Sequence, residues 1–129
     1  MPRKSATTPR YEDVALGVLV YEFDFDDPAE ADRKIKRRLR DKKLGPYDAA
    51  RIARLRRFKD AVQKEVHRFD KSRYYLGARG PVCPQGRYAD LKDFDRARMV
   101  RDYAKQFRGI PRSSIVWFVD FAVFSYYVR

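Results

Sequence analysis

The chain has 129 residues, a formal net charge of +12 from 30 Lys and Arg against 18 Asp and Glu, and one cysteine, Cys83. A single cysteine excludes an intrachain disulfide, and a hydrophobic content of 44% suffices for one folded domain with a modest core. The first ten residues lack the apolar core of a secretory signal, and the apolar segment 115–128 is shorter than a transmembrane helix of about 20 residues.

The N-terminal part divides into a basic arm and an apolar segment with acidic ends. Residues 1–10 (MPRKSATTPR) contain no core residue, so we expect them to be disordered in isolation. Residues 11–25 favour a helix started by Thr8–Pro9, although the alternation of residues 21–25 leaves a strand as the alternative. Asp27–Pro28 then predicts the N-cap and first position of the next helix.

The densest basic run of the chain is Arg33–Lys43 (RKIKRRLRDKK), in which eight of eleven residues are Lys or Arg. On the helix predicted at 28–43, only Ala31, Ile35 and Leu39 would form an apolar stripe. Like charges one turn apart destabilise such a helix in water. The run therefore predicts a strongly anionic partner, for which nucleic-acid phosphate is the obvious candidate.

A second helix is predicted over 46–69, because Gly45 and Pro46 would end the first helix and open the next. The short link indicates a helical hairpin. Apolar residues recur on one face of this second helix at spacings of three and four: Ile52, Leu55, Phe58, Val62, Val66 and Phe69. The opposite face interleaves basic residues with small ones, so that a phosphate backbone could approach closely: Arg54, Arg57, Lys64 and Arg68 with Ala50 and Ala61.

The second half of the chain predicts a loop and two more helices. Residues 71–89 are rich in Gly and Pro and indicate a long loop, and an amphipathic helix is expected over 90–107. The segment 113–129 (SSIVWFVDFAVFSYYVR) is apolar on all sides. Its length favours a helix capped by Ser113 or Ser114, with a buried strand as the alternative. In so small a domain, such a segment predicts contact with another subunit or a membrane surface.

These elements predict a mostly α protein. We expect a nucleic-acid-binding arm and helical hairpin at 1–70, a loop or joint at 71–89, and a small apolar helical bundle for packing and subunit contact at 90–129. Helical geometry selects the residues that would contact phosphate, together with the basic residues of the arm: Arg3, Lys4, Arg10, Arg33, Lys36, Arg37, Arg40, Lys43, Arg54, Arg57, Lys64 and Arg68.

Other chemistry-bearing residues have simpler explanations. His67 is expected on a helix surface, Cys83 has no nucleophile partner, and Tyr74–Tyr75 is expected to pack in a core or interface rather than to stack on bases. Three carboxylates before the basic helix could hold a divalent metal for nuclease chemistry, yet an N-capped turn explains them: Asp24, Asp26 and Asp27. We therefore predict no enzyme, no catalytic residue, no metal site and no cofactor.

The arm MPRKSATTPR, the hairpin RKIKRRLRDKKLGPYDAARIARLRRFK and the apolar end IVWFVDFAVFSYYV together resemble the plan of a known family. It is that of the α-helical major capsid proteins of filamentous archaeal viruses: rudiviruses, lipothrixviruses and tristromaviruses. The Arg- and Tyr-rich composition without Asn is most similar to the enveloped tristromaviruses, and depletion of thermolabile amides is a trend in hyperthermophiles. The acidic, apolar stretch 11–27 departs from the family plan.

The resemblance implies a virion protein whose N-terminal helices wrap double-stranded DNA and hold it in A-form. It further implies homodimers, or heterodimers with a paralogue, that stack as a helical nucleocapsid filament, and a C-terminal helix that meets neighbouring subunits or the envelope. Outside the virion we expect a cytoplasmic protein. The alternatives are a small DNA-binding regulator or chromatin protein, an RNA- or ribosome-associated protein, and a metal-dependent nuclease using Asp24 and Asp26.

Overall fold

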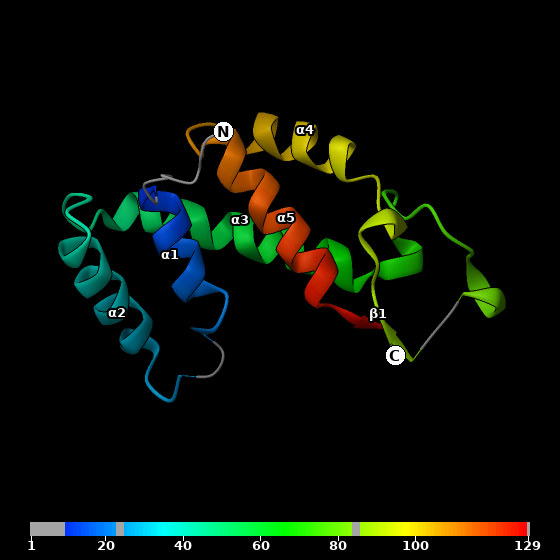
Figure 1. Cartoon of the computed structure of the whole chain (residues 1–129), viewed down its shortest axis with the longest axis horizontal. Coiled ribbons are helices and arrows are strands. Elements are labelled where there is room, and N and C mark those ends of the chain that lie inside the picture. Colours follow the sequence, from blue (N-terminus) through cyan, green and yellow to red (C-terminus); the bar gives the residue numbers. More distant parts are fainter. Residues whose placement is uncertain (1–9, 23–24, 84–85, 129) are drawn as a thin grey trace, which may run out of the picture. The chain divides into compact units, whose positions relative to one another are not determined.

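We describe the fold from a computed structural model, in which the described residues are 10–22, 25–83 and 86–128. This part of the chain contains five α-helices and one short pair of strands, so the predicted mostly α class is confirmed (Figure 1). The chain forms two compact units, Met1–Arg56 and Arg57–Arg129, and the boundary between them falls inside the third helix. Each unit has its own set of buried apolar residues.

The first unit begins with α1 (Tyr11–Leu19), most of which is buried. The predicted helix is confirmed here, but its predicted end at residue 25 is wrong, since isolated turns follow Leu19. The reason is electrostatic: acidic residues follow from Glu22 onward, and carboxylates are unfavourable at the negative C-terminal end of a helix. Residues 21, 22 and 25 form no strand, and Thr8–Pro9 lies outside the described residues.

Helix α2 (Pro28–Asp41) starts as predicted. The Asp27 carboxylate accepts a hydrogen bond of 2.9 Å from the backbone N–H of Ala29, and Pro28 occupies the first helical position. Helices α1 and α2 contact each other, and the single apolar stripe of α2 is buried: Ala31, Ile35 and Leu39. Most of the basic residues of α2 are therefore left exposed.

The end of α2 differs from the prediction. The N–H of Leu44 donates to the carbonyl of Leu39 at 3.0 Å, and the N–H of Lys43 donates to the carbonyl of Arg40 at 3.1 Å. These paired bonds define a Schellman cap, which needs a left-handed residue just beyond the helix. Lys43, with a φ of 55°, fills that position, whereas Gly45 was expected to do so.

Helix α3 (Ala49–His67) begins later than the predicted start at residue 46, because Asp48 caps it and Pro46 is not its first residue. The Asp48 carboxylate accepts hydrogen bonds of 3.1 Å from the N–H groups of Ala50 and Arg51. Arg56 of α3 reaches Asp32 of α2, so the chain doubles back at 42–48. All residues of the predicted apolar face are buried: Ile52, Leu55, Phe58, Val62, Val66 and, in the turn after the helix, Phe69.

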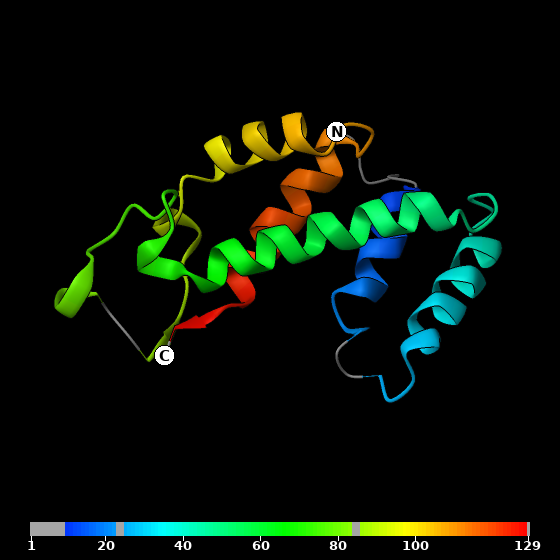
Figure 2. The ribbon, with the colours of Figure 1, turned by 180° about the vertical axis from the view of Figure 1, so that it is seen from behind.

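The core of the second unit is built around Phe58 of α3. Its ring centroid lies 6.0, 5.5 and 5.5 Å from those of Tyr103, Phe107 and Phe118. Tyr103 belongs to α4 (Arg96–Gln106) and Phe118 to α5 (Arg112–Ser125), and these two helices also contact each other (Figure 2). Three helices thus share one aromatic core.

The start of α4 is not the predicted residue 90. A short 3-10 turn, Leu91–Asp93, stands at this position. The Asp90 side chain accepts a backbone hydrogen bond from the turn, and the Asp93 side chain accepts one from the backbone N–H of Asp90. Asp95 then caps α4 by accepting a hydrogen bond of 3.2 Å from the N–H of Arg98. The end of α4 at Gln106 agrees closely with the predicted residue 107.

The apolar segment near the C-terminus is a helix, α5, as its length favoured. Its N-cap is Pro111; the predicted caps Ser113 and Ser114 are wrong, and Ser114 is buried inside the helix. Within this chain α5 is not buried on all sides, because Trp117 and Phe124 are 41% and 67% exposed. None of the helices in the described part of the chain combines the length and the apolarity that crossing a membrane requires.

The predicted loop 71–89 ends in β1 (Arg87–Tyr88), which pairs antiparallel with β2 (Tyr127–Val128). Tyr74 and Tyr75 are buried in this loop, so their predicted role in packing is confirmed. The Tyr75 hydroxyl lies 3.8 Å from the Cys83 sulfur, and burial, with that contact, raises the pKa of Tyr75 to about 12. The loop is therefore part of the packed structure of the second unit, through its buried tyrosines and through β1.

Candidate nucleic-acid interface

The outer surface of α2 is the strongest candidate for a phosphate-binding site. We call it the α2 basic face; it consists of exposed cations on α2 and in the turn that follows: Arg33, Lys36, Arg37, Arg38, Arg40, Lys42 and Lys43. Because the apolar stripe of the helix is buried, these side chains project away from the core. Two of them, Arg38 and Lys42, are not among the predicted contact residues.

Most cations of the α2 basic face have weak partners or none. Arg33 forms an exposed ion pair with Asp27 at 3.2 Å, and Arg40 lies 3.9 Å from Asp41. Lys36 places its ammonium nitrogen 5.0 Å from the ring centroid of Tyr47. Within the described ranges, the remaining members have no ion-pair partner: Arg37, Arg38, Lys42 and Lys43. Exposed pairs contribute little, so the face keeps nearly its full positive charge.

Three acidic residues of the first unit, Glu12, Glu22 and Asp32, pair with cations of α3. The buried Glu12 carboxylate accepts a hydrogen bond from Arg51, and this bond raises the pKa of the Arg51 guanidinium. Arg56 lies 3.2 Å from Glu22 and 3.0 Å from Asp32. Burial disfavours its charged form, yet these carboxylates outweigh burial and raise its pKa. Arg51 and Arg56 thus stabilise the fold through ion pairs, whereas the arginines of the α2 basic face do not have buried carboxylate partners among the described residues.

The predicted cations of α3 lie on the side away from its apolar face. Arg57 and Lys64 are exposed, Arg54 is half-buried, and the exposed Arg68 lies 3.8 Å from Glu65. The structure places Arg54 in the first unit and the other three in the second. Among the arm residues, Arg10 is exposed at the start of α1, whereas Arg3 and Lys4 lie outside the described residues.

The residues considered for other chemistry have structural contacts. His67 is exposed, as predicted, and stacks on Tyr126 with ring centroids 4.8 Å apart. Asp27 caps α2 and its pKa is lowered, chiefly by the N–H of Ala29 and also by Arg33, while Asp24 lies outside the described residues. No group of three or more potential metal ligands occurs among the residues that the structure describes.

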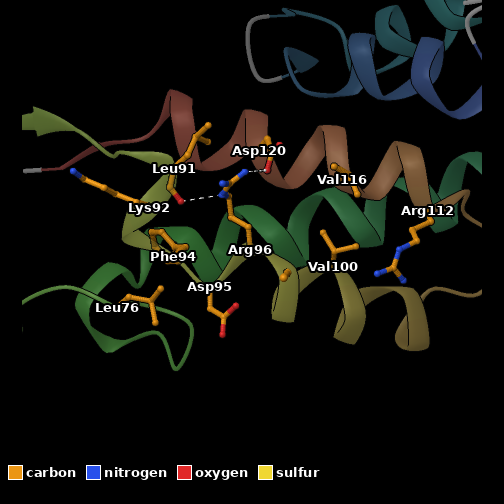
Figure 3. A pocket seen from close by; sticks show the side chains of 11 residues that line it. Leu76, Leu91, Lys92, Phe94, Asp95, Arg96, Val100, Arg112, Val116 and Asp120 are labelled. Atoms are coloured by element: carbon orange, nitrogen blue, oxygen red, sulfur yellow. Dashed lines mark hydrogen bonds and ion pairs between the residues drawn. The ribbon is translucent and has the colours of Figure 1, made fainter. Parts of the chain in front are cut away.

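A shallow groove of about 550 Å³ lies between α4, α5 and the 3-10 turn in the second unit (Figure 3). Leu91, Val100 and Val116 contribute apolar surface to it. Arg96 crosses the groove and donates hydrogen bonds of 2.9 Å to the Leu91 carbonyl and to Asp120. The charged groups at its centre are thus bonded to each other, and they serve the packing of α4 against α5.

Helix α4 carries a basic surface that was not among the predicted contact residues. Arg98, Arg101 and Lys105 follow the same spacing of three and four that marked the cations of α3, so the signal was present. The clear apolar face of the same segment predicted packing and drew attention away from its basic side.

Comparisons of the chain with protein families, with curated proteins and with solved structures found no match.

Proposed function

We propose that this protein coats duplex DNA without sequence preference, as a structural subunit of a helical nucleocapsid. The observation that carries the proposal is the α2 basic face. Its cations are exposed, and three nearby carboxylates, those of Glu12, Glu22 and Asp32, pair with Arg51 and Arg56 of α3 instead. A helix with cations around most of its circumference suits a polyanion lying against it better than a groove read by a few side chains.

The proposal includes what the capsid resemblance implies: an A-form duplex, location in the virion of an archaeal virus, and stacked subunits. Support for the stacking comes from α5, where Trp117 and Phe124 are exposed and Trp117 stacks on Phe121 with centroids 5.6 Å apart. Exposed aromatic residues on one helix are typical of a protein–protein contact. We assign this surface to a second copy or a paralogue, with the viral envelope as the alternative.

The test is the salt dependence of binding to random-sequence duplexes. For a coat protein we expect a slope of log K against log salt steeper than about −4 and discrimination between sequences below about tenfold. The variant R37Q/R38Q/K43Q removes three cations of the α2 basic face and should make the slope shallower by about 2.5. The control K71Q/K92Q/R112Q removes the same charge from exposed positions elsewhere and should change the slope much less.

Three outcomes would contradict the proposal and redirect it. Strong sequence preference with a discrete saturated complex in light scattering would favour a small DNA-binding regulator. Preferential binding of structured RNA in competition would favour an RNA- or ribosome-associated protein. Mg²⁺-stimulated cleavage of the duplex would favour the nuclease. Continuous filaments on DNA in electron micrographs are the result that the coat role requires.

A further inference from the structure

The second unit carries most of the excess positive charge. Residues 57–129 contain 16 basic and 8 acidic residues, a net charge of +8, whereas residues 1–56 contain 14 basic and 10 acidic residues, a net +4. The predicted contact residues of the second unit are Arg57 and Lys64 of α3 and Arg68, which directly follows that helix. A large part of the charge of this unit therefore lies outside the interface described so far.

Helix α4 divides into an apolar side and a basic side. Met99, Val100 and Tyr103 are buried. The other side carries Arg98, Arg101 and Lys105, with Arg108 just beyond the end of the helix, and the spacing of three and four places them together. Arg101, Lys105 and Arg108 are exposed, and Arg98 is half-buried. We call this set, together with the neighbouring Arg73, the α4 basic face.

The α4 basic face is anchored by a buried tyrosine. The Tyr74 ring lies under two guanidinium groups, with the Arg73 and Arg98 carbons 5.0 and 5.4 Å from its centroid. The Tyr74 hydroxyl donates to Asp102 at 2.7 Å and accepts from Arg73 at 2.9 Å. Cation–π contacts and this hydrogen bond restrict both arginines before any ligand arrives, which reduces the entropy that binding would otherwise cost.

The carboxylates of the second unit leave much of this face unneutralised. Asp102 is 3.8 Å from both Arg73 and Arg101, and its best hydrogen bond comes from Tyr74. Lys105 and Arg108 have no ion-pair partner among the residues that the structure describes. In the first unit, by contrast, the arginines that stabilise the fold pair directly with carboxylates of other segments: Arg51 with Glu12, and Arg56 with Glu22 and Asp32.

We infer that the α4 basic face is a second phosphate-binding surface, which holds the sugar–phosphate backbone of a duplex through its guanidinium and ammonium groups. This inference rests on the proposed function and adds a second contact to it. From Arg98 to Lys105 the helix rises about 10 Å, which spans about three phosphates of one strand. Arginine forms bidentate contacts with phosphate, and arginines make up all but one member of the face.

The first experiment uses the unaltered chain. Lysines are acetylated with a water-soluble reagent in the presence and absence of a random-sequence duplex, and the modification of each lysine is measured by mass spectrometry. Lys105 should be protected severalfold by the duplex, as should Lys43 of the α2 basic face. Lys92, which is exposed at the rim of the groove, should react equally in both samples. Protection of Lys43 without protection of Lys105 would overturn the inference and leave the proposed function intact.

The second experiment compares the variant R101Q/K105Q/R108Q with the control K71Q/K92Q/R112Q, which loses the same charge elsewhere. All six positions are exposed, and unchanged thermal unfolding verifies that both variants fold. We expect the slope of log K against log salt to become shallower by about 2.5 for the α4 variant. Equal slopes for variant and control would overturn the inference. Failure of the unaltered chain to bind duplex would overturn the proposed function as well. Unchanged DNA binding with lost self-association would instead assign the face to carboxylates of a second copy.

Discussion

At the scale of single residues, the fold assigns different roles to cations that look alike in the sequence. Arg51 and Arg56 lie on α3 within one or two turns of Arg54 and Arg57, yet among the described residues only the first two pair with carboxylates of the first unit. Their partner Glu12 is 39 positions away from Arg51. No local spacing rule links such residues, so structural and free arginines could not be separated from the sequence.

The pair Glu12–Arg51 gives an asymmetric prediction. The Glu12 side chain is 3% exposed and that of Arg51 is 40% exposed. The variant R51Q leaves a buried carboxylate without its ion pair and should lower the free energy of unfolding by about 3 kcal/mol. The variant E12Q leaves an arginine that water can reach and should cost about 1 kcal/mol. Urea denaturation of both variants measures the difference, and equal losses would contradict the burial argument.

Asp93 gives a prediction for the pH dependence of stability. Burial acts to raise the pKa of its carboxyl, but hydrogen bonds from Arg87 at 2.9 Å and from the N–H of Asp90 at 2.7 Å outweigh burial and lower it. A lowered pKa means that the ionised group stabilises the fold above the unfolded value of about 3.9, and that this contribution is lost as the pH falls through the folded value.

The variant D93N should therefore be less stable than the native chain at pH 7, by about 1–2 kcal/mol, because it loses charge-assisted hydrogen bonds. Below a pH of about 4 the difference should begin to shrink, because the carboxyl of the unfolded native chain takes up a proton first, and it should be smallest once the pH has fallen through the lowered pKa of the folded state. Thermal unfolding of both proteins from a pH of about 7 down to about 2 tests this, because that range brackets the ordinary carboxyl pKa of about 3.9. A difference that stays constant down to the lowest pH would show that Asp93 acts by packing and not by charge.

At the scale of elements, apolar periodicity located the helices but not their ends. The spacing from Ile52 to Phe69 predicted the buried face of α3 in full, because burial and period follow from the same helix geometry. The starts of α3 and α4 were missed because the caps, Asp48 and Asp95, were not recognised as such. In the basic hairpin, the apolar stripe of α2 is narrow, so the rest of that helix was expected to be exposed. This part of the candidate site could therefore be predicted from the sequence.

The end of α2 offers a test that separates stability from binding. Lys43 has a φ of 55°, a conformation that costs a non-glycine residue about 1 kcal/mol, so K43G should stabilise the protein by up to about 1 kcal/mol. The same change removes one cation of the α2 basic face and should make the salt slope of duplex binding shallower by about 0.9.

The control for K43G is K42G. Lys42 has a φ of −97°, so glycine relieves no strain there and should destabilise the protein while it removes the same charge. Chemical denaturation and filter binding of both variants provide the two readouts. If K43G and K42G lost stability equally, the left-handed cap would have no energetic role.

At the scale of the whole molecule, charge and apolar surface are distributed so that each unit offers something to a partner. The first unit presents the α2 basic face, and the second presents the α4 basic face and the exposed aromatic residues of α5. The net charge of +12 predicted an anionic partner, but composition does not show how the positive charge is distributed over the surfaces of the fold. That distribution depends on which carboxylates the fold brings to which arginines.

The exposed face of α5 gives the last prediction. Trp117 and Phe124 lie seven positions apart, which places them on one side of the helix, and both are accessible in the single chain. If they contact a second subunit, the variant W117S/F124S should reduce concentration-dependent association in light scattering and shorten the filaments formed on DNA. Its salt slope for duplex binding should not change, because no cation is altered.

The matched control is L76S/V82S, which removes two exposed apolar side chains of the loop, 64% and 72% exposed, without touching α5. Association should persist in this control, since general surface hydrophobicity changes while the aromatic face remains. If the unaltered chain stayed monomeric but floated with vesicles, and W117S/F124S did not float, α5 would be a lipid-facing helix. That result would assign the exposed face of α5 to the envelope and not to a subunit interface. The two phosphate-binding faces are tested separately, by the salt dependence of duplex binding.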